Sequence, residues 1–161
     1  MPEGTSESGE VDPQEDREGE QDPPAAVPAV LDFSSQTVDG AAFEGSSLAG
    51  RPAVLWFWAP WCPTCRGQIE VVSAAADQFA DEVAFVGVGS LDDSEAIDDF
   101  AADVPAREIA QLADPDGEVW RHFGITEQST YVVLDAEGRT VTSGYLDDAE
   151  LLDVVGDLAG S

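Results

Sequence analysis

The chain has 161 residues, of which 34 are acidic and six basic, and its formal net charge is −28. Nucleic acids and anionic membrane surfaces attract clustered cations, so this composition argues against both as partners. No stretch approaches the roughly 18–20 consecutive apolar residues that span a bilayer. The N-terminus also lacks a basic region followed by an apolar one. As printed, the sequence is expected to be that of a soluble chain without an export signal.

The N-terminal segment differs in composition from the rest of the chain. The first 24 residues carry nine acids and a single base, Arg17, and contain no aromatic residue. Such a segment buries too little apolar surface to offset the entropy that it would lose on ordering. We therefore predict a disordered acidic, proline-rich linker over residues 1–28 and one domain over residues 29–161. That domain is itself acidic, because residues 25–161 retain a net charge of −20.

Strands and helices alternate along the expected domain. Residues 30–43 are expected to form a hairpin that turns at Asp39-Gly40, and residues 46–48 a helical turn. Further strands are expected at residues 53–58, 83–88, 130–134 and 140–145. Helices are expected at residues 62–80, 92–102, 119–123 and 146–159, with Ser94 as a candidate cap. This order predicts an α/β sandwich: parallel strands joined by crossover helices, followed by an edge hairpin.

The segment Trp61-Cys62-Pro63-Thr64-Cys65 holds both cysteines of the chain, at an expected strand-to-helix junction. The helix start places unpaired N–H groups and the positive end of the helix dipole beside Cys62, which favours its thiolate. Pro63 suits the first helical position, where a missing N–H costs nothing. Cys65 follows one turn later, close enough to attack a mixed disulfide at Cys62. We expect Cys62 to be the accessible thiol and Cys65 to be shielded behind it.

Other interpretations of these residues are less favourable. A zinc site usually needs four Cys or His ligands, and only His122 adds to the two cysteines, so neither a metal nor another cofactor is expected. A purely structural disulfide across so short a loop would constrain little of the unfolded chain. Arg66 shares a helix face with Cys62 and would lower its pKa, although a solvated surface role fits Arg66 equally well. For His122 a surface role is favoured over that of a base paired with a cysteine.

The segment Phe57–Cys65, the Thr130–Gly138 stretch and the terminal helix together resemble thioredoxin-fold proteins. The N-terminal hairpin, the extra helix at 92–102 and the Asp114–Gly117 turn resemble the TlpA/ResA/DsbE-like redoxin branch of that fold. The resemblance implies a mixed central sheet with helices on both faces and an N-terminal hairpin extension.

The same resemblance implies a role for each cysteine. Cys62 would be the attacking thiolate, Cys65 the resolving thiol, and Pro60 and Trp61 the lip over which a partner chain lies. Protein thiols and disulfides would be the substrates, a separate redox partner would recycle a monomeric protein, and no cofactor would be needed. Because the pattern is similar to secreted DsbE-like proteins, an extracytoplasmic location is expected, either secreted or tethered through a segment N-terminal to this chain. A cytoplasmic location stays open.

Two departures from the family pattern affect the expected site. Trp56 stands six positions before Cys62, where many thioredoxins bury an acid, so Cys65 must lose its proton to water or to an unidentified base. Ser129 stands where the family has a cis-proline, and the preceding peptide bond could be trans or a strained cis. The residues assigned to the substrate groove or to tuning of the Cys62 pKa are Trp61, Pro63, Thr64, Arg66, Gln128, Ser129 and Thr130. Ser129 is expected within roughly 7 Å of the sulfurs, where its N–H and hydroxyl would stabilise the Cys62 thiolate.

The leading functional hypothesis is a protein thiol:disulfide oxidoreductase that works through a mixed disulfide. A thiol peroxidase is the enzymatic alternative, although peroxidases of this fold resemble Thr-x-x-Cys and this chain has Ala59 at that threonine position. A redox-silent binding module is the non-enzymatic alternative, and the altered loop at Ser129 keeps it open.

Overall fold

The computed structural model describes residues 27–160, and a seven-stranded mixed sheet forms its framework. The strands are β1 (Ser34–Thr37), β2 (Ala42–Glu44), β3 (Ala53–Trp58), β4 (Ala84–Gly89), β5 (Ile109–Ala113), β6 (Thr130–Leu134) and β7 (Thr140–Gly144). They lie in the order β2-β1-β5-β4-β3-β6-β7. The three central strands β5, β4 and β3 are parallel, whereas the hairpins at both edges pair antiparallel.

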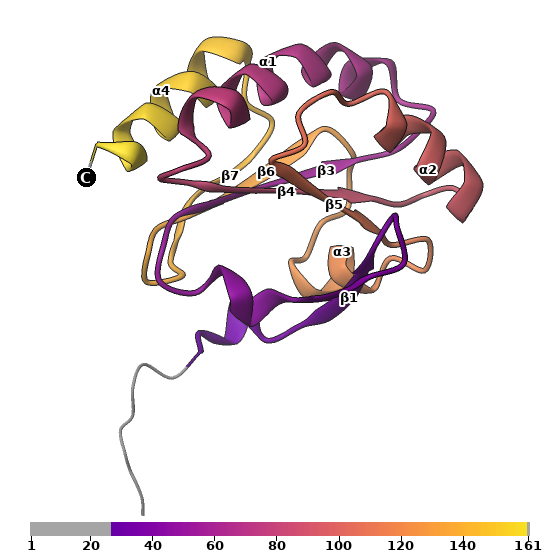
Figure 1. Ribbon diagram of the computed structural model, residues 1–161, viewed down its shortest axis with the longest axis horizontal. Helices are drawn as coiled ribbons and strands as arrows, with labels where there is room; N and C mark the ends of the chain where they lie inside the picture. Colours follow the sequence, from indigo (N-terminus) through magenta and orange to yellow (C-terminus); the bar gives the residue numbers. More distant parts are fainter. Residues whose placement is uncertain (1–26, 161) are drawn as a thin grey trace, which may run out of the picture.

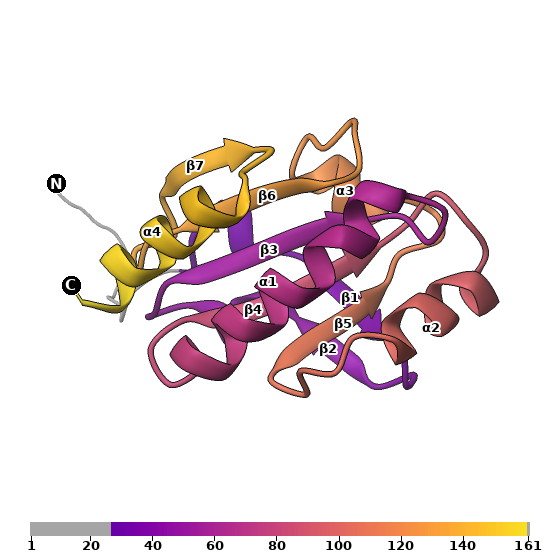
Figure 2. The same cartoon turned by 90° about the horizontal axis from the view of Figure 1, so that it is seen from above.

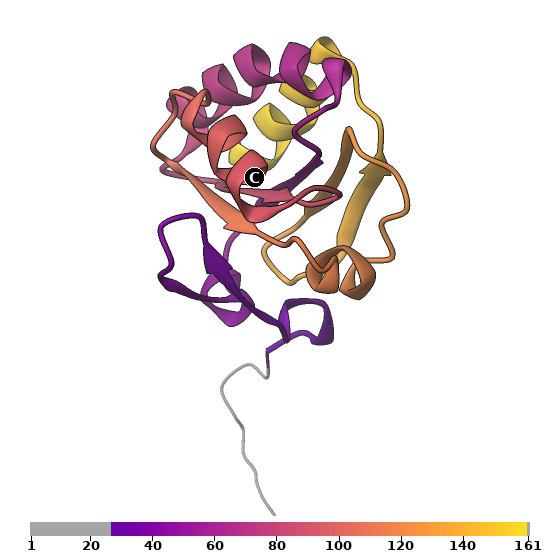
Figure 3. The same cartoon turned by 90° about the vertical axis from the view of Figure 1, so that its right-hand side faces the viewer.

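Helices cover both faces of the sheet, which confirms the expected α/β architecture. The helices are α1 (Pro63–Phe79), α2 (Ser94–Ala102), α3 (Glu118–His122) and α4 (Asp148–Ala159), with 3-10 turns η2 (Ala29–Leu31) and η3 (Gly45–Leu48). Helices α1, α2 and α4 lie together above the sheet (Figures 1 and 2), while α3 lies below it (Figures 1 and 3). None of the described helices is long and apolar enough to cross a membrane.

The central strand β3 divides the core into two layers. All six of its residues are buried, and successive side chains of a strand point to opposite faces. Val54, Trp56 and Trp58 belong to the layer under α1, α2 and α4, which also contains both cysteines. Ala53, Leu55 and Phe57 belong to the layer that includes Val119 and Trp120 of α3. Two hydrophobic layers on one strand explain why this segment is apolar without alternation.

Three local expectations are wrong. Residues 109–113 form β5, although no strand was predicted there. Residues 29–31 form the 3-10 turn η2 rather than the start of the hairpin, while the turn at Asp39-Gly40 is confirmed. Asp93 rather than Ser94 caps α2, because its carboxylate accepts the Ala96 N–H at 2.9 Å. The predicted linker lies almost wholly outside the described residues.

Candidate functional site

The two cysteines lie where β3 leads into α1. Cys62 is the N-cap residue of α1, and its sulfur accepts the backbone N–H of Cys65 at 3.1 Å, as a capping side chain does. Both cysteines are free thiols and both are buried, with Cys62 2% and Cys65 0% exposed. The expectation of an openly accessible Cys62 is therefore wrong, because the first turn of α1 and Ser129 pack around its sulfur. Its burial removes competing water from the hydrogen bonds that it receives.

The surroundings of the two sulfurs move their pKa values apart. Burial raises the pKa of the Cys62 thiol, but hydrogen bonds from the Cys65 and Ser129 side chains outweigh burial. Backbone N–H groups of Cys65 and Thr64 act in the same direction, so the pKa of Cys62 lies below its ordinary value. Burial, with a smaller contribution from the neighbouring Cys62, raises the pKa of Cys65 to about 11. One sulfur is thus prepared as a thiolate and the other retains its proton.

Ser129 lies directly beside the two thiols. Its hydroxyl oxygen is 3.2 Å from Cys62 Sγ and 3.1 Å from Cys65 Sγ, well inside the predicted distance. The peptide bond before Ser129 is trans, since the described residues contain no cis bond, and φ of Ser129 is +65°. The Ser129 N–H donates to the carbonyl oxygen of Phe57 at 2.8 Å. Of the two groups that we expected near Cys62, therefore, only the hydroxyl faces the sulfurs.

Arg66, which follows Cys65, pairs with Asp103 and not with Cys62. The Arg66 guanidinium donates to Asp103 at 3.0 Å and lies 4.8 Å from the ring centre of Phe100. These contacts tie the first turn of α1 to α2. Arg66 is not among the groups that shift the pKa of Cys62. The surface interpretation of Arg66 therefore fits the structure better than an electrostatic role at the thiolate.

The position of the family's buried acid is filled by a hydrogen-bonded indole. Trp56 Nε1 donates to Gln68 Oε1 of α1 at 2.8 Å, and both side chains are buried. No carboxylate is among the groups that shift the pKa of Cys65. His122 is also remote from this chemistry: its Nε2 lies 2.8 Å from the carbonyl oxygen of Val30, and its ring packs against Phe33. Among residues 27–160, His122 is therefore engaged elsewhere, and none of the main groups that shift the pKa of Cys65 is a carboxylate.

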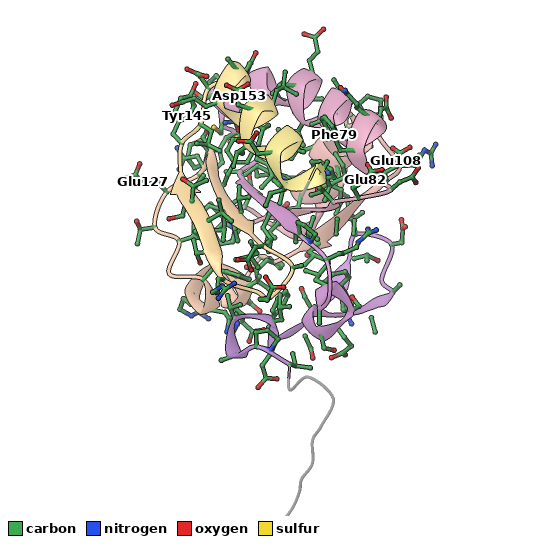
Figure 4. All side chains as sticks on the ribbon, turned by 90° about the vertical axis from the view of Figure 1, so that its left-hand side faces the viewer. Phe79, Glu82, Glu108, Glu127, Tyr145 and Asp153 are labelled. Carbon is green, nitrogen blue, oxygen red and sulfur yellow. The ribbon has the colours of Figure 1, made fainter. Side chains whose placement is uncertain are left out.

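A groove lies along β6 and β7, and its lining includes Thr64 and Ser129, which are next to the cysteines. It has a volume of about 640 Å³ and is lined by Thr64, by residues 123–130 and by Tyr145. Gln128, Ser129 and Thr130 thus line the same groove as Thr64. Glu127 and Tyr145 lie at the surface on this side of the molecule (Figure 4). The Thr130 hydroxyl donates to the carbonyl oxygen of Glu127 at 2.8 Å, which holds the loop rather than the sulfurs.

Exposed apolar side chains frame the same end of the molecule. Trp61 is 53% exposed and its indole N–H donates to the carbonyl oxygen of Leu91 at 3.0 Å. Leu91 and Tyr145 are also exposed, and neither was predicted from the sequence. The available signal for Leu91 was a large apolar residue placed between a buried strand and the acidic pair Asp92-Asp93. Large exposed apolar groups that lie close together are typical of a surface that contacts other proteins.

The sequence matches a known protein family. A family model described as Redoxin matches residues 24–156. The chain belongs to the redoxin family. The described residues contain no cluster of His, Cys, Asp or Glu suited to a metal ion.

Solved redoxin structures share the fold. MTB dsbF, solved in mixed oxidized and reduced forms, has a TM-score of 0.77 and 47% identity, covering 83% of this chain and 99% of that one. A secreted Mycobacterium tuberculosis disulfide oxidoreductase, described as homologous to E. coli DsbE, has a TM-score of 0.73 and 34% identity, covering 80% and 98%. These likenesses confirm the thioredoxin-like fold.

A curated relative points in the same direction. The soluble secreted antigen MPT53 of Mycobacterium tuberculosis is 38% identical over 110 residues, which are 67% of this chain and 61% of the antigen. The chain thus spans less than two thirds of the length of that relative.

Proposed function

We propose that this redoxin is a protein thiol:disulfide oxidoreductase. The observation that carries the proposal is the division of chemistry between two adjacent sulfurs. The pKa of Cys62 is lowered by the hydrogen bonds that it receives, while burial holds the pKa of Cys65 at about 11. Exchange needs a thiolate for the first attack and a second thiol that waits until a mixed disulfide has formed. The names of the similar proteins, which include a disulfide oxidoreductase, support the same activity.

Each step follows from the positions of the sulfurs. The Cys62 thiolate attacks a partner disulfide, forms a Cys62–partner bond and releases one partner sulfur as a thiolate. Cys65 then loses its proton and attacks Cys62 Sγ, which releases the second partner sulfur and leaves a Cys62–Cys65 disulfide. The partner is thereby reduced by two electrons and the dithiol is oxidised by two. The reverse sequence oxidises a partner dithiol, and a separate redox partner would restore the starting state.

The surface around the dithiol favours protein substrates over small molecules. Trp61 and Leu91 form an exposed apolar lip beside Cys62, and the groove that ends at Tyr145 continues from it. An extended chain can lie on such a surface and present its sulfur to Cys62. We further propose that the protein is a monomer and acts outside the cytoplasm, where disulfides persist. The names of the relatives support this location, since two of them are described as secreted.

Two assays test the activity and the roles of the cysteines. The wild type should accelerate the reduction of insulin by dithiothreitol, and both Cys62→Ser and Cys65→Ser should abolish the acceleration. Cys65→Ser should accumulate mixed disulfides with a protein substrate, because the resolving thiol is missing, whereas Cys62→Ser should accumulate almost none. Trapping on Cys65 instead of Cys62 would reverse the assignment. Peroxide consumption without insulin reduction would identify a peroxidase. Activity in neither assay would identify a binding module.

A further inference from the structure

One hydroxyl group contacts both sulfurs of the site. Ser129 Oγ lies 3.2 Å from Cys62 Sγ and 3.1 Å from Cys65 Sγ, and the residue is 9% exposed. We propose that Ser129 is a third catalytic residue, whose hydroxyl donates a hydrogen bond to whichever cysteine sulfur carries the negative charge. This inference rests on the proposed oxidoreductase function and adds a residue to its machinery.

The need for such a group follows from the movement of charge during exchange. In the reduced protein the negative charge is on Cys62. In the mixed disulfide Cys62 Sγ is neutral, and Cys65 must release its proton to water before its sulfur can attack. The Cys65 sulfur then bonds to Cys62 Sγ, the bond to the partner breaks, and the partner leaves as a thiolate that takes a proton from water. In the reverse direction Cys65 is the leaving thiolate, so both directions place charge on a buried sulfur.

Ser129 can stabilise both charged states without moving a heavy atom. A hydroxyl has one proton, which turns about the Cβ–Oγ bond, and two lone pairs that accept. With Cys62 ionised, Ser129 donates to Cys62, to which the Cys65 thiol also donates. With Cys65 ionised, the same proton turns to Cys65. A donor that is already in place when charge develops requires little reorganisation, which is the basis of oxyanion-hole catalysis.

The backbone of Ser129 fixes the oxygen in this position. Its N–H is held by the Phe57 carbonyl at the end of β3, the strand that leads to Cys62. Its φ of +65° lies in the left-handed region, which non-glycine residues enter uncommonly. The hydroxyl, the left-handed backbone and the engaged N–H therefore act together to place one donor between two sulfurs.

No other described side chain near Cys65 replaces this donor. Trp56, at the position of the family's acid, donates its indole N–H to Gln68. The Tyr131 hydroxyl is buried without a hydrogen-bond partner. The backbone of Ala59 also lowers the pKa of Cys65, but a backbone N–H cannot turn from one sulfur to the other. Ser129 is the side chain that hydrogen-bonds to both.

The test separates attack from resolution. Reduced protein is mixed in a stopped-flow instrument with a chromogenic aryl disulfide, which releases one coloured thiolate when Cys62 attacks and a second when Cys65 resolves. The wild type should show both phases, which tests the proposed function on its own. Ser129→Ala should slow the second phase at neutral pH by at least about tenfold, and should move its pH profile to higher pH.

Two matched variants identify the hydroxyl as the cause. Ser129→Gly removes the hydroxyl at a φ that glycine adopts freely, so it should slow resolution as much as Ser129→Ala does. Ser73 is a buried residue of α1 whose hydroxyl has no hydrogen-bond partner. Ser73→Ala should therefore leave both phases unchanged.

Three results would overturn one proposal or the other. A second phase within about twofold of wild type in both Ser129 variants excludes a catalytic hydroxyl. Slow resolution in Ser129→Ala with normal resolution in Ser129→Gly assigns the effect to the backbone and also excludes the proposal. A wild type that releases no second thiolate would instead overturn the oxidoreductase function itself.

Discussion

Two residues of the same type perform different chemistry here because their hydrogen bonds differ. Cys62 receives donors from the N-terminus of α1 and from Ser129, whereas Cys65 lies one turn inside the helix and is fully buried. The sequence was sufficient to predict this division, because a cap position and a position one turn later always differ in free N–H groups. The pairing of Arg66 with Asp103 could not be predicted, since it joins residues far apart in the chain.

Alkylation of the reduced protein should distinguish the two thiols by pH. Only the thiolate reacts, and the pKa of Cys62 lies below the ordinary 9.0 while that of Cys65 is about 11. As the pH rises from acid, iodoacetamide should therefore label Cys62 first, and Cys65 should react only in strongly alkaline solution. Peptide mass spectrometry measures both rates, and Cys62→Ser provides the control for Cys65 alone. Labelling of Cys65 at the lower pH would contradict the assignment.

Replacing Ser129 by the family's proline tests how far this site has diverged. The family pattern alone predicts that Ser129→Pro restores the groove and changes the reduction potential and partner turnover. The structure adds a conflict, because proline fixes φ near −65° and has no N–H, whereas Ser129 has φ of +65° and donates to Phe57. The variant should lose more than about 1 kcal/mol of stability. Thermal unfolding of Ser129→Pro measures this loss, with Ser129→Gly as the control. An unchanged stability would show that the loop rearranges freely.

The elements show where local sequence patterns are informative and where they are not. Strand β3 could be predicted from its unbroken apolar run, and helix α1 from the helical spacing of its apolar residues. Strand β5 could not, since its central Gln111 is polar and its two alanines have little preference for strands. The structure supplies the reason for Gln111: its Oε1 accepts the Trp58 indole N–H at 3.1 Å across β4. A strand stabilised by such a tertiary contact has no local signature.

Two glycines allow the packing of these elements to be tested. A Cβ added to Gly89 of β4 would lie 2.5 Å from the indole of Trp58, which is fully buried and stacked on Phe100. Gly89→Ala should therefore destabilise the protein by about 1–3 kcal/mol. Gly67→Ala in α1 meets nothing within 4 Å and should stabilise the protein by about 0.5–1 kcal/mol. Denaturant unfolding of both measures the difference, and equal stabilities would mean that the Trp58 layer is loosely packed.

At the scale of the whole molecule, fold and charge are separate properties of the sequence. The parallel pairing of β3, β4 and β5 follows from the helices that join them, whereas the net charge of −20 on residues 25–161 does not determine any element. Of the described arginines, Arg66 and Arg139 are already paired with Asp103 and Asp135. Most carboxylates therefore have no cationic partner, and their summed field extends beyond the surface.

This field should select among disulfide substrates by charge. Acidic residues lie next to the lip and the groove, with Asp92 and Asp93 after Leu91 and with Glu127 before Gln128. At low ionic strength the reduced protein should react about tenfold faster with cationic cystamine than with anionic dithiodipropionate, since the field concentrates the cation. Neutral hydroxyethyl disulfide is the matched control and should fall between them.

Salt distinguishes this field from a specific contact. Near 1 M salt the Debye length falls to about 3 Å. The rate constants for the cationic, neutral and anionic disulfides should then converge, once each is divided by the rate constant of that disulfide with a small neutral thiol. Glu127→Gln removes one charge beside the groove and should reduce the preference for cystamine only at low salt. A preference that persists at high salt would instead require a defined anionic pocket near Cys62. The net charge would then determine solubility alone, and local carboxylates would determine which partner disulfides react.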